Sequence, residues 1–305
     1  MAWLHRILFP SHGIAPQASL VPRPLHLTAP PFASPYCYAA LHFSPPLHCC
    51  ASPGAASPRA PTSLLRGTGP ALRDMKAQWG SIIPDTTNTW VENGDCNNHG
   101  SFDHLSCDGS GFVTRLDLSS NYLTGALPET IGGFNKLLYF YIDSNSLSGP
   151  LPSNFSKLVS LREFDAHSNK ISGPLPDGIG ALTALQQLYL YNNQLEGPIP
   201  ASFTQLTALT LIELQYNQIT GPLPGNLGSV SQLIALRAYN NHISGPVPPT
   251  LTATTNLRFI ELGSNDLSGT IPTNVATITT LQTLDLSHNE ISGPFQITGM
   301  HRLFT

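Results

Sequence analysis

The stretch LQQLYLYNNQLEGPIP, residues 185–200, alternates between apolar and polar positions before it reaches a pair of asparagines. An alternation with period two is typical of a β-strand with one buried face. Leu188 and Leu190 would then point into a core, whereas Tyr189 and Tyr191 would point to solvent. The glycine and proline that follow suit a bend and a return segment that is not helical. The stretch therefore predicts a strand, a turn and a non-helical return.

The same markers recur every 24 residues along the chain. A glycine follows each repeated asparagine by four positions, and a proline follows the first seven of them by seven positions. Such a period predicts stacked units that share one core, because a single unit cannot bury its apolar side alone. Neighbouring strands should pair in parallel, and each asparagine amide should bond backbone groups where its strand ends, as a buried ladder. The repeated asparagines are Asn121, Asn145, Asn169, Asn193, Asn217, Asn241, Asn265 and Asn289.

The pattern LxxLxLxxNxLxGxIPxxL resembles the plant-type leucine-rich repeat of receptor-kinase ectodomains and polygalacturonase-inhibiting proteins. The resemblance covers about residues 71–296. It implies an α/β repeat fold, a right-handed solenoid with a parallel concave sheet, eight 24-residue units and a helical N-terminal cap. Residues 113–296 would form the units, 71–112 the cap, and 297–305 a truncated or atypical C-terminal tail.

The expected cap begins with ALRDMKAQWG, residues 71–80. Helical spacing places Leu72, Met75 and Trp79 on one face of this segment, and Trp90 follows before the first repeat. We therefore predict a helix here that covers the apolar front of the stack.

The first 73 residues contain five arginines, no acidic residue and many prolines. They have too little apolar periodicity to bury a core, so residues 1–70 are interpreted as a disordered leader. An organelle transit peptide, a secretory signal peptide and a misassigned gene start are three alternatives for it. No run approaches the roughly 18 to 20 apolar residues of a transmembrane helix, so no membrane span is expected.

Residues 74–305 hold all 18 acidic residues against nine lysines and arginines. An acidic body argues against a nucleic-acid partner, because phosphate binding needs a basic surface. No phosphate-cradling loop or nucleophile motif is present, so neither a cofactor nor an enzymatic activity is expected. The triplet Asp165, His167 and Ser168 resembles catalytic groups, but the same repeat positions hold tyrosine or glutamine elsewhere. It is interpreted as part of a sheet surface.

The cap contains Cys96, His99, His104 and Cys107, a spacing that could supply four ligands to zinc. The family resemblance instead implies a disulfide between Cys96 and Cys107, since members carry a cysteine pair in this cap. We expect the disulfide and no metal.

Asn154 begins the single N-x-S/T sequence of the chain and is expected to carry a glycan off the concave face. Together with the resemblance, this favours a secreted or cell-surface protein of the apoplast. A plastid is the alternative if the leader is a genuine transit peptide.

The solvent side of the predicted strands gathers tyrosines and acids. Tyrosine combines a large contact area with a polar tip, which suits recognition, and the acids would select a partner carrying Lys or Arg. The alternative is an ordinary solvated sheet, on which tyrosine is common. The predicted partner-binding residues are Tyr139, Tyr141, Asp143, Asp165, His167, Tyr189, Tyr191, Glu213, Tyr216, Arg237, Tyr239 and Glu261.

The resemblance implies a non-catalytic module that recognises a peptide or protein in receptor-like or co-receptor-like signalling or defence. Inhibition of a cell-wall hydrolase is one alternative, with a folded enzyme as the partner. An N-terminal part of a leucine-rich-repeat receptor kinase is another.

Overall fold

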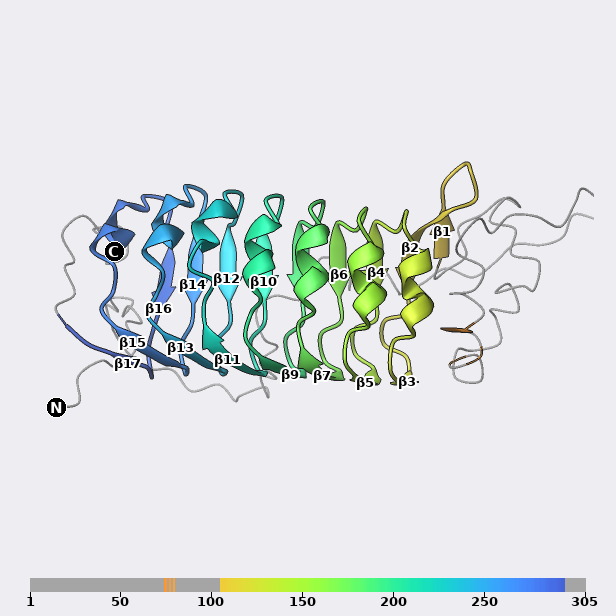
Figure 1. The fold of residues 1–305 in the computed structure, drawn as a ribbon, viewed down its shortest axis with the longest axis horizontal. Helices are drawn as coiled ribbons and strands as arrows, with labels where there is room; N and C mark the ends of the chain where they lie inside the picture. The colour runs from red at the N-terminus through yellow and green to blue at the C-terminus, as the bar shows by residue number, and fades with distance from the viewer. Residues whose placement is uncertain (1–73, 76, 78, 80–104, 294–305) are drawn as a thin grey trace, which may run out of the picture. The chain divides into compact units, whose positions relative to one another are not determined.

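A sheet of nine strands runs through the repeats (Figure 1). The computed structural model describes Asp74, Met75, Ala77, Trp79 and residues 105–293. Strand β1 pairs antiparallel with β2, and every later pair is parallel and joins residues 24 apart, as in Phe164 opposite Leu188. In spatial order the strands are β1 (Leu105–Cys107), β2 (Val113–Asp117), β4 (Tyr139–Tyr141), β6 (Glu163–Asp165), β8 (Gln187–Tyr189), β10 (Leu211–Glu213), β12 (Ala235–Arg237), β14 (Phe259–Glu261) and β16 (Thr283–Asp285).

A second sheet of eight parallel strands follows the asparagines, and the sequence did not predict it. It forms because the residues after each asparagine also repeat in register, so that Gly173 lies opposite Leu195 of the next unit. Its strands are β3 (Thr124–Gly125), β5 (Ser146–Gly149), β7 (Lys170–Pro174), β9 (Gln194–Gly197), β11 (Gln218–Pro222), β13 (His242–Gly245), β15 (Asp266–Gly269) and β17 (Glu290–Ile291).

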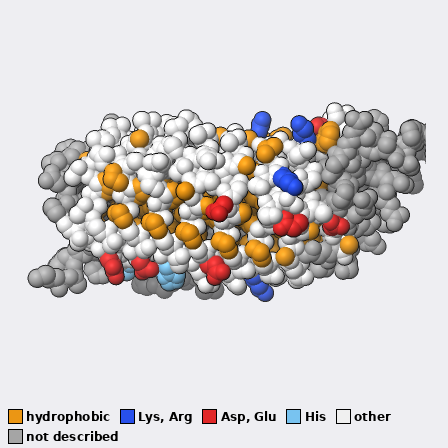
Figure 2. All heavy atoms as spheres, in the orientation of Figure 1, with side chains coloured by type: hydrophobic (Ala, Val, Ile, Leu, Met, Phe, Trp, Pro, Cys, Tyr) orange, Lys and Arg blue, Asp and Glu red, His pale blue; other side chains and the backbone are white. Residues whose placement is uncertain are grey.

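Short 3-10 helices complete the units, so the expectation of a non-helical return was wrong. Six of the seven described begin directly after a proline, whose extended backbone leaves its carbonyl free to accept the first helical bond, as from Ile131 N to Pro128 O at 3.0 Å. Charged side chains are sparse on the side that these helices face (Figure 2). The helices are η2 (Glu129–Gly133), η3 (Ser153–Lys157), η4 (Asp177–Ala181), η5 (Ala201–Gln205), η6 (Leu227–Ser229), η7 (Pro249–Ala253) and η8 (Thr273–Thr277).

The predicted asparagine ladder is confirmed. Asn217 is 8% exposed; its Nδ2 donates to Leu190 O and Leu214 O at 2.9 and 3.0 Å, and its Oδ1 accepts from Leu195 N at 2.9 Å. Leu190 and Leu195 belong to the preceding unit, so one amide joins two units. Six other asparagines, from Asn145 to Asn289, make the same set of bonds.

The core lies between the two sheets and the short helices. Leu188 and Leu190 are fully buried, as their alternation predicts, whereas the equivalent Leu284 and Leu286 of the last unit are only partly buried. Burying a leucine contributes roughly 1.5–3 kcal/mol, so the repeated leucines supply much of the driving force for stacking. The tyrosines of residues 185–200 take no part in this core.

The expected cap falls mostly outside the described residues, including Leu72 and Trp90. The four described residues between 74 and 79 have helical backbone, and Met75 and Trp79 are fully buried with the core. Trp79 Nε1 also donates to Thr124 O at 2.8 Å. The cap as a whole stays a prediction. Among the described residues, no helix is long and apolar enough to cross a membrane.

The residue before each repeated asparagine adopts a left-handed backbone, with φ between 53° and 57°. Side chains with a Cβ seldom adopt this conformation, which asparagine tolerates best. Serine, asparagine or histidine occupies the position in seven units, but Tyr216 occupies it in the fifth. The fold therefore accepts a bulky ring at a place where a small polar residue would be less strained.

Replacing Asn217 by alanine should lower the free energy of unfolding by about 2–4 kcal/mol. It orphans the buried Leu195 N–H, at roughly 1–3 kcal/mol, and removes one of the two amide donors from each of Leu190 O and Leu214 O, which keep their bonds to Asn193 and Asn241. Urea unfolding of the full chain followed by circular dichroism measures this. Gln218→Ala changes the exposed neighbouring side chain and should cost less than about 0.5 kcal/mol. If both substitutions lowered the free energy of unfolding equally, the asparagine ladder would not be a special source of stability.

Candidate functional site

The solvent side of the nine-stranded sheet presents three rows of side chains, and we call this surface the sheet face. Strand register defines the first two rows, and backbone bonds such as Ser168 N to Tyr191 O continue it into the third. The first row is Arg115, Tyr139, Glu163, Gln187, Leu211, Ala235, Phe259 and Thr283; the second is Asp117, Tyr141, Asp165, Tyr189, Glu213, Arg237, Glu261 and Asp285; the third is Ser119, Asp143, His167, Tyr191, Gln215, Tyr239, Gly263 and Ser287.

The structure places eleven of the twelve predicted partner-binding residues in these rows, and Tyr216 directly after the third. All except Tyr216 are half-buried, and Tyr216 is 53% exposed. Their contact with a partner stays a prediction. The structure does show which of them touch one another.

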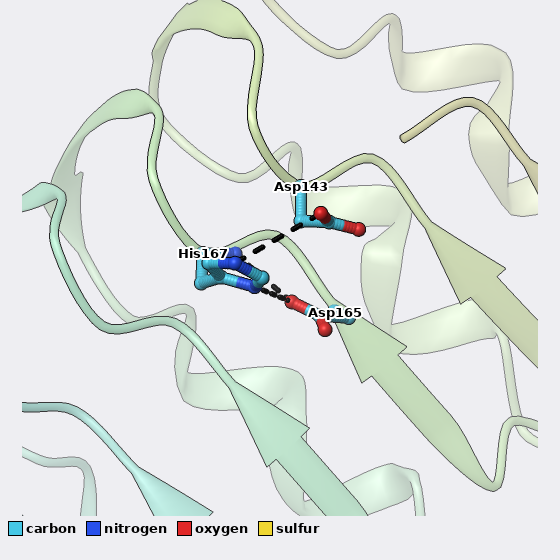
Figure 3. Close-up of side chains that lie close together, drawn as sticks. All are labelled: Asp143, Asp165 and His167. Atoms are coloured by element: carbon cyan, nitrogen blue, oxygen red, sulfur yellow. Dashed lines mark hydrogen bonds and ion pairs between the residues drawn. The ribbon is translucent and has the colours of Figure 1, made fainter. Parts of the chain in front are cut away.

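Asp143, Asp165 and His167 form one group, the Asp–His cluster (Figure 3). His167 Nδ1 lies 2.6 Å from Asp165 Oδ1, and its Nε2 lies 3.9 Å from Asp143 Oδ2. The imidazole also stacks on the Tyr191 ring, with centroids 4.4 Å apart. Two strands and two consecutive units thus meet in a partly buried acidic group.

The cluster shifts the protonation of its own members. Burial raises the pKa of the Asp143 carboxyl to about 6, and the charge of Asp165 adds to this. Burial alone would lower the pKa of His167, but the bond to Asp165 and the charges of Asp165 and Asp143 raise it above its ordinary value. The cluster therefore becomes more negative as the pH rises through 6 and beyond.

Metal binding by the Asp–His cluster would require rearrangement. Its three members could each offer one ligand atom, all within 4.8 Å of one another. However, His167 Nδ1 and Asp165 Oδ1 already bond each other, and a metal ion held by these two atoms would have to replace that bond. We therefore assign the cluster an electrostatic role.

Tyrosine rings continue along the face from this cluster. Tyr189 OH donates to Gln187 Oε1 at 2.9 Å, and the rings of Tyr216 and Tyr239 meet edge to face at 5.2 Å. Burial and then the nearby acids raise the pKa of Tyr189 and Tyr191 well above 10, so these phenols stay protonated. Their hydroxyls are therefore neutral at physiological pH, and that of Tyr189 already donates to Gln187.

Both arginines of the face are already engaged by acids. Arg237 Nη1 lies 2.6 Å from Glu213 Oε1 and its Nε lies 3.3 Å from Glu261 Oε2. Arg115 pairs with Asp117 at 3.1 Å and lies over the Tyr141 ring, 4.5 Å from its centroid. The seven acids in the three rows outnumber the two arginines, so the net charge of the face is negative.

Gln215 is a feature that the sequence reasoning missed. It is 6% exposed, and its Oε1 has no hydrogen-bond partner, although it stands in the third row between Tyr191 and Tyr239. The sequence shows a polar residue at a solvent-facing repeat position, and nothing in the pattern distinguishes it from an exposed one. Its burial depends on side chains 24 residues away on either side.

The remaining sequence candidates have other surroundings. Ser168 Oγ accepts a hydrogen bond from Asn192 Nδ2 at 3.1 Å. Asn154 lies on η3, away from the sheet face, and its Nδ2 donates to Glu129 O at 3.1 Å, so glycosylation there stays a prediction. The disulfide also stays a prediction, because Cys107 lies in β1 but Cys96 is outside the described residues.

Comparison with known families matches the leucine rich repeat at three places, residues 113–171, 184–206 and 277–294. Curated Arabidopsis thaliana relatives that match include receptor-like proteins and LRR receptor-like kinases. The matched segments span only about 4–6% of their length.

Solved structures match a larger part of this chain than the family models do. The complex of PEPR1 with AtPEP1 is 30% identical with a TM-score of 0.70, over 75% of this chain and 32% of that one. The Arabidopsis receptor kinase HAESA, in complex with the peptide hormone IDA and the co-receptor SERK1, is 35% identical with a TM-score of 0.56, over 58% and 29%. Pollen Receptor Kinase 3 is 30% identical with a TM-score of 0.57, over 65% of this chain and 95% of that one. The chain belongs to the leucine-rich repeat proteins of plant type and resembles the ectodomains of plant receptor kinases and receptor-like proteins.

Proposed function

We propose that the chain is a non-catalytic recognition module that binds a basic peptide, or a basic segment of a protein, across the sheet face. A receptor-like or co-receptor-like role at the cell surface follows from the same proposal. The single observation that carries it is the gathering of tyrosines and acids on a surface that the core does not need.

The tyrosines favour a role in recognition, because the stability of the fold does not depend on them. Core packing is supplied by the inward leucines, and the ladder satisfies the strand ends, so Tyr141, Tyr189 and Tyr191 are not required by either. Partly buried rings with protonated hydroxyls offer contact area at a low cost in conformational entropy. Their shared side of the sheet favours one continuous contact.

The charge of the face supports a basic partner. Its arginines are engaged by neighbouring acids, whereas Asp143 and Glu163 have pKa values raised chiefly by burial, so their charges are poorly compensated. A Lys or Arg side chain would supply the missing positive charge. Strands about 4.8 Å apart give a face roughly 35 Å long, enough for an extended segment of about ten residues.

The similar receptors also favour a peptide as the ligand. HAESA was solved in complex with a peptide hormone and a co-receptor, and its repeats align with 58% of this chain. A second receptor, RGFR1, is described as a plant peptide hormone receptor and is 33% identical. Extension of that role to this chain is part of the proposal.

Changing Tyr141, Tyr189 and Tyr191 together to alanine should abolish peptide capture. We expect the immobilised full chain to enrich Lys- and Arg-containing members of a random library of peptides about ten residues long, and added salt to weaken the capture. The triple variant should lose at least about tenfold in affinity, which removal of 1.4 kcal/mol of contact would produce.

Tyr122→Ala is the matched control, because Tyr122 is 84% exposed and lies outside the three rows. Urea unfolding should show that all variants remain folded. Equal capture by the wild type and the triple variant would contradict the proposal.

Binding of a basic peptide should strengthen as the pH rises from about 5.5 to 7.5. Asp143, with a pKa of about 6, gains its negative charge over this range, and His167 loses positive charge as the pH passes its raised pKa. Both changes attract a cation, so we expect an increase in affinity of roughly three- to tenfold. Isothermal titration calorimetry at several pH values measures it.

Asp143→Asn should flatten this pH profile by about half, leaving the part due to His167. Asp285→Asn removes an acid of the same face in the last unit and should keep the slope while lowering the affinity slightly. An unchanged slope in Asp143→Asn would show that the Asp–His cluster does not meet the ligand.

A further inference from the structure

Gln215 combines burial with an unmet hydrogen bond. Among the described residues of the three rows it is the one polar side chain that is buried, at 6% exposure. Its Nε2 donates to Glu213 Oε2 at 3.4 Å, whereas its Oε1 has no partner. A buried acceptor without a donor is costly, and native proteins keep few of them. A donor from outside the chain would remove that cost.

The orientation of the amide is fixed by its neighbour. Exchanging the oxygen and nitrogen of Gln215 would bring Oε1 against the Glu213 carboxylate, where two acceptors repel each other. The unmet group is therefore the oxygen, and its missing partner must be an N–H or O–H group.

The walls beside Gln215 are aromatic. Tyr191 stands one strand before it and Tyr239 one strand after it in the same row, about 10 Å apart at the spacing of a sheet. A planar group that stacks on a ring needs about 3.5 Å on that side. Gln215 itself occupies the strand between the two rings, so a ligand group over its amide has a tyrosine on either side, and a flat group can stack on one of them.

The charge beside Gln215 is negative. Glu213 and Glu261 share the single positive charge of Arg237, which leaves the group of three with a net charge of −1. A cation that enters next to Glu213 would balance it. The required ligand group is thus flat, cationic and rich in N–H donors.

Tyr216 adds a third tyrosine, next to Gln215 in the sequence. Its ring meets Tyr239 edge to face at 5.2 Å and is 53% exposed, on a left-handed backbone where neighbouring units carry Asn192 and Asn240. Its contact with Tyr239 is the one ring contact that the structure describes for this side chain. A side chain this exposed can change rotamer within nanoseconds, so its ring can adjust to a ligand that lies over Gln215.

We propose that Tyr191, Gln215, Tyr216 and Tyr239 form a subsite for one arginine side chain of the bound segment. The inference rests on the proposed function and names the residue type that the face selects. The guanidinium stacks on tyrosine and donates to Gln215 Oε1, with Glu213 as its counter-charge. Lysine fits less well, because its ammonium is a compact point charge that cannot stack as a plane.

Two amidated peptides of about 12 residues test the subsite, one with repeats of Gly-Ser-Arg and the other with repeats of Gly-Ser-Lys. They have the same length and charge, so calorimetry with the full chain isolates the choice between arginine and lysine. The wild type should bind the arginine peptide at least about fivefold more tightly. Gln215→Leu should abolish that preference while the lysine peptide still binds.

Controls separate the subsite from general folding effects. Tyr216→Asn changes an exposed side chain to the residue of the neighbouring units and should also reduce the preference for arginine. Gln218→Leu, in β11 of the other sheet, should leave it intact. Gln215→Leu should unfold at the same urea concentration as the wild type or a higher one, because it replaces an unpaired buried acceptor by an apolar group.

Each result decides something different. A preference for arginine that persists in Gln215→Leu, or equal binding of both peptides to the wild type, overturns the subsite while the proposed function stands. Binding of neither peptide overturns both. Loss of the preference in Gln215→Leu and Tyr216→Asn, with the lysine peptide still bound, supports the subsite.

Discussion

The buried amide of the repeated asparagine is the interaction on which the rest of the structure depends. In seven units, from Asn145 to Asn289, it bonds carbonyls where one strand ends and also an N–H of the preceding unit, and in the central units it is buried from water. Polar backbone at a turn of this kind could not be buried without such a partner. The ladder therefore satisfies the backbone at one turn after another while the leucines remain continuously packed.

Because the leucines and the asparagines stabilise the fold, the residues of the sheet face can vary from unit to unit. Inward positions are tied to the core and the asparagines to the ladder, but each row position on the face can hold any residue that suits a strand. The third row uses this freedom most, since it holds serine, aspartate, histidine, tyrosine, glutamine and glycine on equivalent backbone. The charges then arrange themselves locally, as in the sharing of Arg237 by two glutamates. The proposed recognition and the folding thus draw on different positions of the same short strand.

Sequence alone predicted the repeat, the parallel sheet, the ladder and the inward leucines, because each depends on spacing along one chain. It also placed the tyrosines and acids on a common face. It did not predict the second sheet, which forms by pairing between units. It also did not predict the 3-10 helices that follow the prolines. The stacking of His167 on Tyr191 and the burial of Gln215 involve more than one unit, so the pattern of a single unit does not contain them. The bond between His167 and Asp165 lies within one unit but depends on side-chain rotamers that the repeat pattern does not specify.

The in-register stacking has a consequence for how such a surface can change over time. Side chains that are neighbours across the sheet come from residues 24 apart in sequence, one unit for each step, so a ligand lying across the proposed face would meet one unit after another. Recombination that duplicates, deletes or exchanges a whole unit would therefore shift or replace a block of three contacts at once, while restoring the same leucines and the same asparagine bonds at both junctions. New specificities become reachable by rearranging modules as well as by accumulating point substitutions.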